Sequence, residues 1–184
     1  MYYDLIISGF GGQGALFAGQ LLAYAAMEAD LQVTWIPSYG PEMRGGTAHC
    51  TVIISDRPIG APLVRNPRIA LAFNNPSLEK YEPLVARGGL LLYNASLATA
   101  APQRRDIEAV GIPGSELAAK IGDPRTLNMI MLGALLELRP IISLDQVRLA
   151  LGRHLPQRHR ALQALDFAAR ALETPALAAR IDEI

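Results

Sequence analysis

The stretch Leu5-Ile6-Ile7-Ser8-Gly9-Phe10-Gly11-Gly12-Gln13-Gly14 decides the fold of this chain. Its first residues are apolar and are typical of a short buried strand, and the glycines that follow are typical of a tight turn. Residues 13–29 are then expected to form a helix. A strand, a loop and a helix in this order predict an α/β protein.

Further segments have the composition of strands and define the sheet. Residues 31–36 and 48–55 are separated by only about ten residues, whereas a parallel crossover needs about a dozen or more. These two strands are therefore expected to be antiparallel or not to be neighbours, which predicts a mixed sheet. Later strands are expected at 68–73, 88–93 and, shorter, 107–110. We predict a three-layer α/β/α fold with a mixed sheet of about five strands.

The last third of the chain is expected to be helical. Ser115 is a candidate cap for a short helix, residues 123–138 follow as a longer one, and Ser143 begins another. A final helix would present one apolar face, made of Leu162, Leu165, Ala169 and Leu172. No repeat or interdomain linker interrupts the sequence, so we predict a single domain over residues 1–184.

The composition narrows the classes of function. The chain has 17 Lys and Arg residues and 17 Asp and Glu residues, so it lacks the positive charge that nucleic-acid binding needs. Its only cysteine, Cys50, allows no internal disulfide and cannot ligate an iron–sulfur cluster alone. No segment reaches the ~20 apolar residues of a membrane helix, and the N-terminus lacks a charged leader. We therefore expect a cytoplasmic protein with neither nucleic acid nor membrane as partner.

The glycine-rich turn Gly9-Phe10-Gly11-Gly12-Gln13-Gly14 matches the dinucleotide pattern G-x-G-x-x-G between a strand and a helix. The carboxylate that would confirm a dinucleotide site belongs near the end of the second strand, where this chain has Ile36-Pro37-Ser38. Three interpretations remain: a dinucleotide site, glycines required for tight packing, or a loop that touches a phosphate group or a partner's backbone. In the last case the Gln13 amide would be the polar contact.

A second loop, Ser38-Tyr39-Gly40-Pro41-Glu42-Met43-Arg44-Gly45-Gly46-Thr47, combines opposite charges with conformationally special residues. Proline fixes φ and the paired glycines allow backbone angles closed to other residues, so the loop has a defined shape. Glu42 and Arg44 can reach the same neighbour. They either brace the turn internally or present charge to a ligand or partner.

The segment after the fourth strand carries polar residues at three-residue spacing. Asn74, Ser77 and Lys80 lie at a strand's carboxyl end, where α/β proteins often bind ligands. Capping of the next helix by Asn75 or Ser77 explains the same residues.

No catalytic or metal-binding set is evident in the sequence. His49 and Cys50 are adjacent on an expected strand, so their side chains should point to opposite faces and cannot act as a base and nucleophile pair. Carboxylates at metal-ligand spacing, a phosphate-binding P-loop and a Ser/His/Asp set are all missing from the sequence. We predict neither a catalytic residue nor a metal site in this chain.

Taken together, three motifs resemble the gamma subunit of the 2-oxoacid:ferredoxin oxidoreductases. They are Gly9 to Gly14, Pro37 to Ala48, and Ser55 with Pro58-Ile59-Gly60-Ala61-Pro62, and the segment 74–80 agrees. The resemblance covers about residues 5–80, and the combination of the motifs in this order makes it specific. The form of the second motif looks most like that of the 2-oxoglutarate or branched-chain members.

The resemblance implies a subunit of an enzyme that oxidatively decarboxylates a 2-oxoacid to an acyl-CoA and reduces ferredoxin. It implies thiamine diphosphate, CoA and iron–sulfur clusters in the full complex, none of them bound by this chain alone. The implied partners are alpha and beta subunits, with a ferredoxin-like delta subunit as a further candidate, and ferredoxin as electron acceptor. The candidate positions near CoA, thiamine or an interface are Gly11, Gly12, Gln13, Gly14, Tyr39, Glu42 and Arg44.

An alternative from another class remains at this point. The chain could be a free-standing module that binds a nucleotide or CoA-like ligand on the Gly9–Gly14 loop, or a scaffold related to the family.

Overall fold

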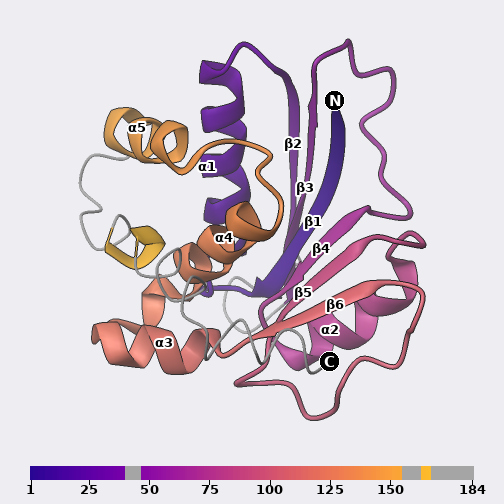
Figure 1. Cartoon of the computed structure of the whole chain (residues 1–184), viewed down its shortest axis with the longest axis vertical. Helices are drawn as coiled ribbons and strands as arrows, with labels where there is room; N and C mark the ends of the chain where they lie inside the picture. The colour runs from indigo at the N-terminus through magenta and orange to yellow at the C-terminus, as the bar shows by residue number, and fades with distance from the viewer. Residues whose placement is uncertain (40–46, 155–162, 167–184) are drawn as a thin grey trace.

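The computed structural model describes residues 1–39, 47–154 and 163–166 of the chain. Within them, six strands form one sheet in the order β2-β3-β1-β4-β5-β6 (Figure 1). The strands are β1 (Tyr2–Phe10), β2 (Gln32–Tyr39), β3 (Thr47–Ser55), β4 (Ile69–Ala72), β5 (Leu90–Asn94) and β6 (Glu108–Ile112). The sixth is the short strand expected near residues 107–110.

The sheet is mixed, as predicted. β1 lies in the middle and pairs antiparallel with β3 and parallel with β4. β2 and β3 form an antiparallel pair, which is the first of the two arrangements that their short connection allowed. β4, β5 and β6 are parallel. One half of the sheet is therefore a parallel α/β arrangement, and the other is a hairpin added to its central strand.

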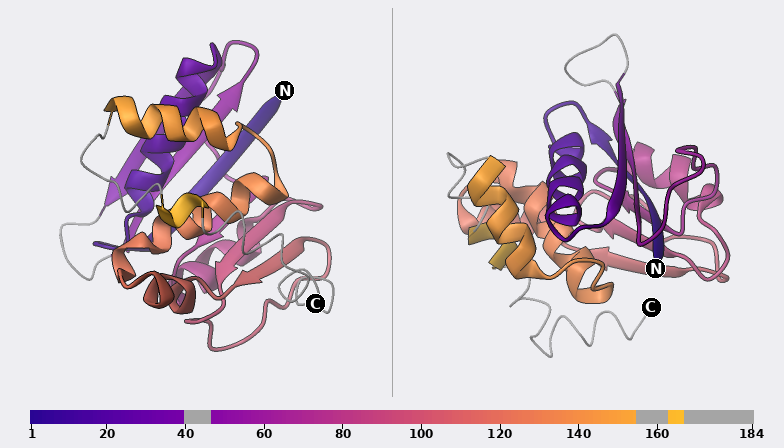
Figure 2. Two further views of the ribbon diagram at one scale, coloured as in Figure 1. Left: turned by 60° about the vertical axis from the view of Figure 1, so that its left-hand side comes forward. Right: turned by 90° about the horizontal axis from the view of Figure 1, so that it is seen from above.

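Helices cover both faces of the sheet, which confirms the three-layer prediction. One layer consists of α1 (Ala15–Glu28), α3 (Gly114–Ile121), α4 (Leu127–Leu138) and α5 (Leu144–His154). The opposite layer is α2 (Asn75–Tyr81) with the 3₁₀ turn η1 (Glu82–Leu84), and a second 3₁₀ turn, η2 (Pro124–Thr126), precedes α4. Figure 2 shows the two layers on either side of the strands.

The core follows from the alternation of β1. Leu5 and Ile7 point into the cluster under α1 and α4, whereas Ile6 points to the cluster under α2. α4 is apolar on almost all sides and is buried along most of its length, as a central helix must be. Gly19 lets α1 approach the sheet, because a Cβ there would collide with the sulfur of Cys50.

Two helix starts differ from the sequence-based expectation. α2 is capped by Asn74 and by neither Asn75 nor Ser77: the Asn74 side chain accepts a hydrogen bond from Ser77 N at 2.9 Å. Asn74 has the extended backbone that an N-cap requires, because β4 has just ended. α3 begins at Gly114 without a side-chain cap, so Ser115 is not its cap. The Ser115 hydroxyl instead accepts a bond from Asn94.

The final expected helix lies mainly outside the described residues. Residues 163–166 are helical, with Ala164 and Leu165 buried, whereas Leu162, Ala169 and Leu172 fall beyond the described part. Among the helices that the structure describes, none has the length and apolar character needed to span a membrane.

Candidate functional site

The loops at the carboxyl ends of β1 and β4 lie where the connections of the sheet diverge. The chain leaves β1 into α1 on one face and leaves the adjacent parallel strand β4 into α2 on the other face. Such a point, at the carboxyl ends of parallel strands, is where open α/β sheets bind ligands. The glycine loop and the Asn74 segment therefore flank the position that the topology favours for a site.

The structure accounts for most glycines of the first loop. A Cβ on Gly9 would lie 2.9 Å from Gln13 Oε1 and 3.2 Å from Phe73 Cβ, and one on Gly14 would collide with the Asn128 amide. Gly12 and Gly14 also have positive φ angles of 102° and 78°. Tight packing and backbone conformation thus explain three of the glycines within this chain.

Gln13 braces the loop from inside. Its Oε1 accepts hydrogen bonds from Phe10 N at 2.7 Å and from Asn74 Nδ2 at 2.8 Å, and its Nε2 donates to Phe73 O at 3.4 Å. The acceptor atom of the amide is already used by two donors. Gln13 thereby joins the end of β1 to the end of β4, and its first role is to position the loop.

The amide contacts continue across the next strand. Asn94, at the end of β5, donates from Nδ2 to Phe73 O at 3.2 Å and to Ser115 Oγ at 2.8 Å, and its Oδ1 accepts from Ser115 N. We call Gln13, Asn74, Asn94 and Ser115 the amide chain. It ties together the carboxyl ends of β1, β4 and β5 and the start of α3. Sequence reasoning missed Asn94, which ends an otherwise apolar strand with a polar side chain.

The N-terminus of α1 opens onto the same edge. Gly14 at the N-cap position makes no side-chain cap, and the first turn of α1 contains no acidic residue. The backbone N–H groups of a helix start carry partial positive charge, which favours an anionic group nearby.

The stem of the second predicted loop lies beside the glycine loop. Tyr39 pairs with Ala48 across the hairpin, and Thr47 pairs with Phe10 of β1. The ends of β1, β2 and β3 therefore meet at one edge. Glu42 and Arg44 lie outside the described residues, and Tyr39 is placed through its backbone.

A small polar cluster lies on the α2 side of this edge. Ser8 of β1 shares a hydrogen bond of 2.9 Å with Ser77 of α2, and the ring of His49 lies 5.9 Å from that of Tyr81. Burial, and then the charge of Lys80, lower the pKa of His49, so its imidazole is neutral at neutral pH. The predicted neighbours Ser77 and Lys80 do lie at this edge, whereas sequence reasoning did not single out Ser8.

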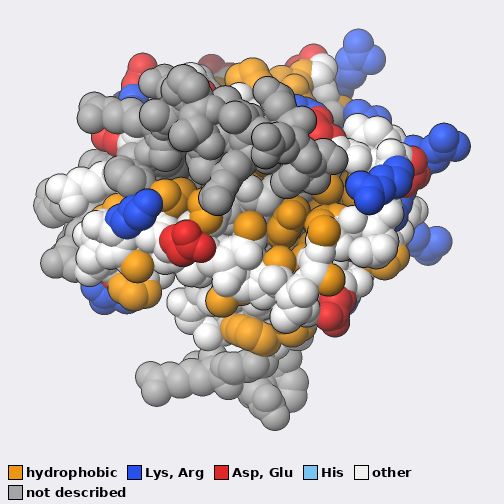
Figure 3. Space-filling view, turned by 60° about the horizontal axis from the view of Figure 1, so that its bottom comes forward, with side chains coloured by type: hydrophobic (Ala, Val, Ile, Leu, Met, Phe, Trp, Pro, Cys, Tyr) orange, Lys and Arg blue, Asp and Glu red, His pale blue; other side chains and the backbone are white. Residues whose placement is uncertain are grey.

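Cys50 is not poised to act as a nucleophile at this edge. Burial raises the pKa of the Cys50 thiol to about 12, and the side chain lies on the face opposite His49, as predicted. Within the described ranges, His, Cys, Asp and Glu form no cluster of three that could hold a metal. Figure 3 brings forward the face of the molecule that lies at the bottom of Figure 1. Uncharged and hydrophobic side chains occupy the middle of this face, and Lys and Arg side chains gather toward its right-hand margin.

The fold defines the class of protein. The crystal structure of the gamma subunit of a keto/oxoacid ferredoxin oxidoreductase from Geobacter sulfurreducens PCA superposes with a TM-score of 0.76 and 28% identity, covering 92% of this chain and 99% of that one. This is the α/β fold of oxidoreductase gamma subunits. The chain belongs to the pyruvate ferredoxin/flavodoxin oxidoreductase family, whose model matches residues 4–174.

Two relatives show how the domain occurs elsewhere. The chain is 35% identical over 160 residues to the 2-oxoglutarate synthase subunit KorC of Methanocaldococcus jannaschii, covering 85% of this chain and 86% of that protein. It is 43% identical over 132 residues to the ketoisovalerate oxidoreductase subunit VorA of Methanothermobacter thermautotrophicus, covering 72% of this chain and 27% of that protein. The chain thus spans less than a third of the length of the VorA relatives.

Proposed function

We propose that this chain is the gamma-type subunit of a 2-oxoacid:ferredoxin oxidoreductase and is inactive alone. The complex would convert a 2-oxoacid and CoA to an acyl-CoA and CO₂, with the released electrons passing through iron–sulfur clusters to ferredoxin. The observation that carries the proposal is the match to KorC over most of both chains. The names of the relatives include ketoisovalerate and 2-oxoglutarate enzymes, so the substrate class is a 2-oxoacid of this kind.

In this proposal the carboxyl-end edge forms one wall of an interface. Thiamine diphosphate, held by a partner subunit, supplies the carbanion chemistry of decarboxylation. This chain contributes the backbone of Gly11, Gly12 and Gly14 beside the start of α1, whose partial positive charge suits the phosphate groups of CoA. Gln13 holds the loop in place through its bonds to Phe10, Phe73 and Asn74.

The second loop has a separate role in the proposal. Tyr39, Glu42 and Arg44 face the catalytic subunits near the CoA and thiamine sites. The support is the pairing of the hairpin stem with β1, which brings the flanks of this loop to the glycine loop. The partners are alpha and beta subunits, a ferredoxin-like delta subunit and soluble ferredoxin, all in the cytoplasm.

Purification of the tagged chain from its native cells tests the proposal. Mass spectrometry should identify a thiamine-binding subunit and an iron–sulfur subunit, and the purified material should reduce ferredoxin only when both a 2-oxoacid and CoA are present. Calorimetry of the isolated chain with NAD, FAD and CoA distinguishes the subunit proposal from the alternative of a free-standing binding module. Tight binding of a dinucleotide by the isolated chain would overturn the subunit proposal.

Substitutions in the second loop test its assigned role. Glu42→Gln and Arg44→Ala should weaken assembly or raise the CoA concentration needed for half-maximal ferredoxin reduction. Asp145→Asn, an exposed change on α5, is the control and should alter neither quantity. If both loop variants assemble normally and keep the wild-type CoA dependence, the role of this loop is wrong.

A further inference from the structure

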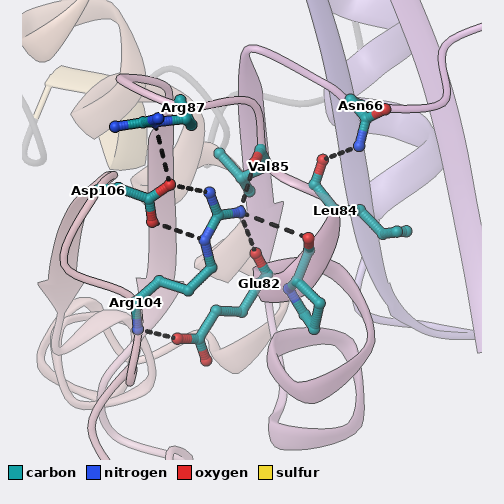
Figure 4. Close-up of polar contacts among 8 residues, drawn as sticks. Asn66, Glu82, Leu84, Val85, Arg87, Arg104 and Asp106 are labelled. Atoms are coloured by element: carbon teal, nitrogen blue, oxygen red, sulfur yellow. Dashed lines mark hydrogen bonds and ion pairs between the residues drawn. The ribbon is translucent and has the colours of Figure 1, made fainter.

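The amino-terminal ends of the parallel strands carry a concentration of arginine side chains. Three loops meet there: Asn66 Nδ2 donates to Leu84 O at 3.1 Å (Figure 4), and Gly88 N donates to Asp106 O at 2.7 Å. Ala86 N also donates to Pro67 O at 2.9 Å. The arginines on these adjoining loops are Arg65, Arg68, Arg87, Arg104 and Arg105.

Arg104 makes its contacts within this edge and holds the loops together. Its guanidinium donates to the carboxylate of Asp106 and to the carbonyl oxygens of Glu82, Pro83 and Val85 (Figure 4). Glu82 Oε1 in turn accepts from the backbone N–H of Arg104 at 2.8 Å. The two carboxylates of these loops, Glu82 and Asp106, are therefore engaged within the chain. We call this set of contacts the Arg104 clamp.

The other arginines remain largely available at the surface. The side chain of Arg87 is 88% exposed and lies 3.8 Å from Asp106 Oδ2, an atom that Arg104 already holds at 2.7 Å. Arg65 and Arg105 are exposed and have no carboxylate within ion-pair distance among the described residues. A chain with zero formal net charge thus carries local positive charge at this edge.

Apolar side chains adjoin the arginines. The guanidinium of Arg68 lies 5.3 Å from the ring centroid of Tyr2, which is itself 39% exposed. Leu63 is 79% exposed, and Leu84 is exposed beside Asn66. Arginine and tyrosine are enriched at protein interfaces, and exposed apolar side chains beside them add area to bury. The exposed leucines offer no contact to a phosphate backbone, so nucleic acid is the poorer fit.

We propose that this edge, through Arg65, Arg87 and Arg105, docks a carboxylate-rich surface of a partner subunit. The arginine forks match carboxylates in pairs, and the engaged Glu82 and Asp106 leave the acidic half of the contact to the partner. This inference rests on the proposed function. It adds a second interface, at the opposite end of the parallel strands from the candidate site, so its loss changes assembly without changing the chemistry of the assembled complex.

The test uses the native complex, dissociated and reassembled from the tagged chain and its partner subunits. Arg65→Glu with Arg105→Glu should raise the dissociation constant about 30-fold at about 0.05 M salt, and the difference should fall to about threefold at about 0.5 M salt. Arg87→Gln should raise it about threefold. Arg125→Gln is the matched control, because Arg125 is also highly exposed (81%) and paired with an aspartate. It should have no effect.

The outcomes separate this inference from the proposed function. Weaker assembly of the double variant, with wild-type turnover once saturating partner restores the complex, supports the inference. Wild-type assembly of the double variant at every salt concentration overturns it and leaves the subunit proposal intact. Variant-sensitive binding of duplex DNA with no change in assembly also overturns it. If the wild-type chain joins no thiamine-binding or iron–sulfur subunit, both fail.

Discussion

Neutral amides join the loops at the carboxyl ends of the parallel strands, whereas a guanidinium and two carboxylates join those at the amino ends. Gln13, Asn74 and Asn94 connect the first set without any formal charge. Arg104 connects the second set to Asp106 and to backbone carbonyl groups. The loops of the carboxyl edge are thus joined by neutral groups alone. The amino edge carries surplus positive charge outward, which suits an acidic partner.

The largest expected effect tests whether the carboxyl edge is set by close packing. Gly14→Ala should lower the free energy of unfolding by about 3 kcal/mol, because it combines a positive φ with a collision against Asn128. Gly12→Ala should cost about 1 kcal/mol, since its φ is positive but the surrounding space is open. Urea unfolding of both variants measures the difference. Equal losses would show that packing on α4 does not constrain the loop.

A smaller effect tests the amide chain itself. Asn94→Ala should lower the free energy of unfolding by about 2 kcal/mol, because it removes the three hydrogen bonds of a buried side chain, to Phe73 O and to half-buried Ser115. Asn75→Ala is the matched control at the same edge. It also removes three hydrogen bonds, to Thr99 and Glu79, but these are exposed and should contribute about 0.5 kcal/mol in total. Equal destabilisation would mean that the amide chain contributes no more than the exposed bonds.

The smallest effect is local and depends on pH. The hydrogen bond from Arg104 holds the pKa of Asp106 below its ordinary value, so this contact stabilises the fold above the ordinary aspartate pKa. The stabilisation should be lost as the pH falls through the lowered pKa, below about pH 4. The side-chain carboxyl and backbone NMR signals of Asp106 should then shift, while those of Gln13 and Asn94 do not follow the same titration. Arg104→Gln should raise the midpoint of this titration toward the ordinary aspartate range, and an unchanged midpoint would contradict the clamp.

Much of the fold could be predicted because it depends on local pattern. The apolar run of β1, the glycines after it and the short connection between β2 and β3 together determined a mixed α/β sheet. β2 extends further than expected, through Pro37 to Tyr39. Proline is tolerated there because β2 is an edge strand, where the missing N–H removes no ladder bond.

The contacts of the site could be predicted only in part. The glycine loop and the Asn74 segment were recognised from spacing, but the bond between Ser8 and Ser77 joins residues 69 positions apart. Whether Asn74 or Asn75 caps α2 depends on the residue at which β4 ends. A difference of one residue at that end changes which asparagine is the cap. The Gln13 amide accepts a hydrogen bond from Asn74 because β4 lies beside β1. The glycine motif alone does not predict this contact.

The central claim, that this chain is one part of a shared enzyme, is tested most directly by comparing CoA binding in two states. Calorimetry should detect no tight CoA binding by the isolated chain and should detect stoichiometric binding by the complex purified through its tag. The same complex should contain a thiamine-binding subunit. Equal CoA affinity of the isolated chain and the complex, or a tag that retains no other subunit, would contradict the claim.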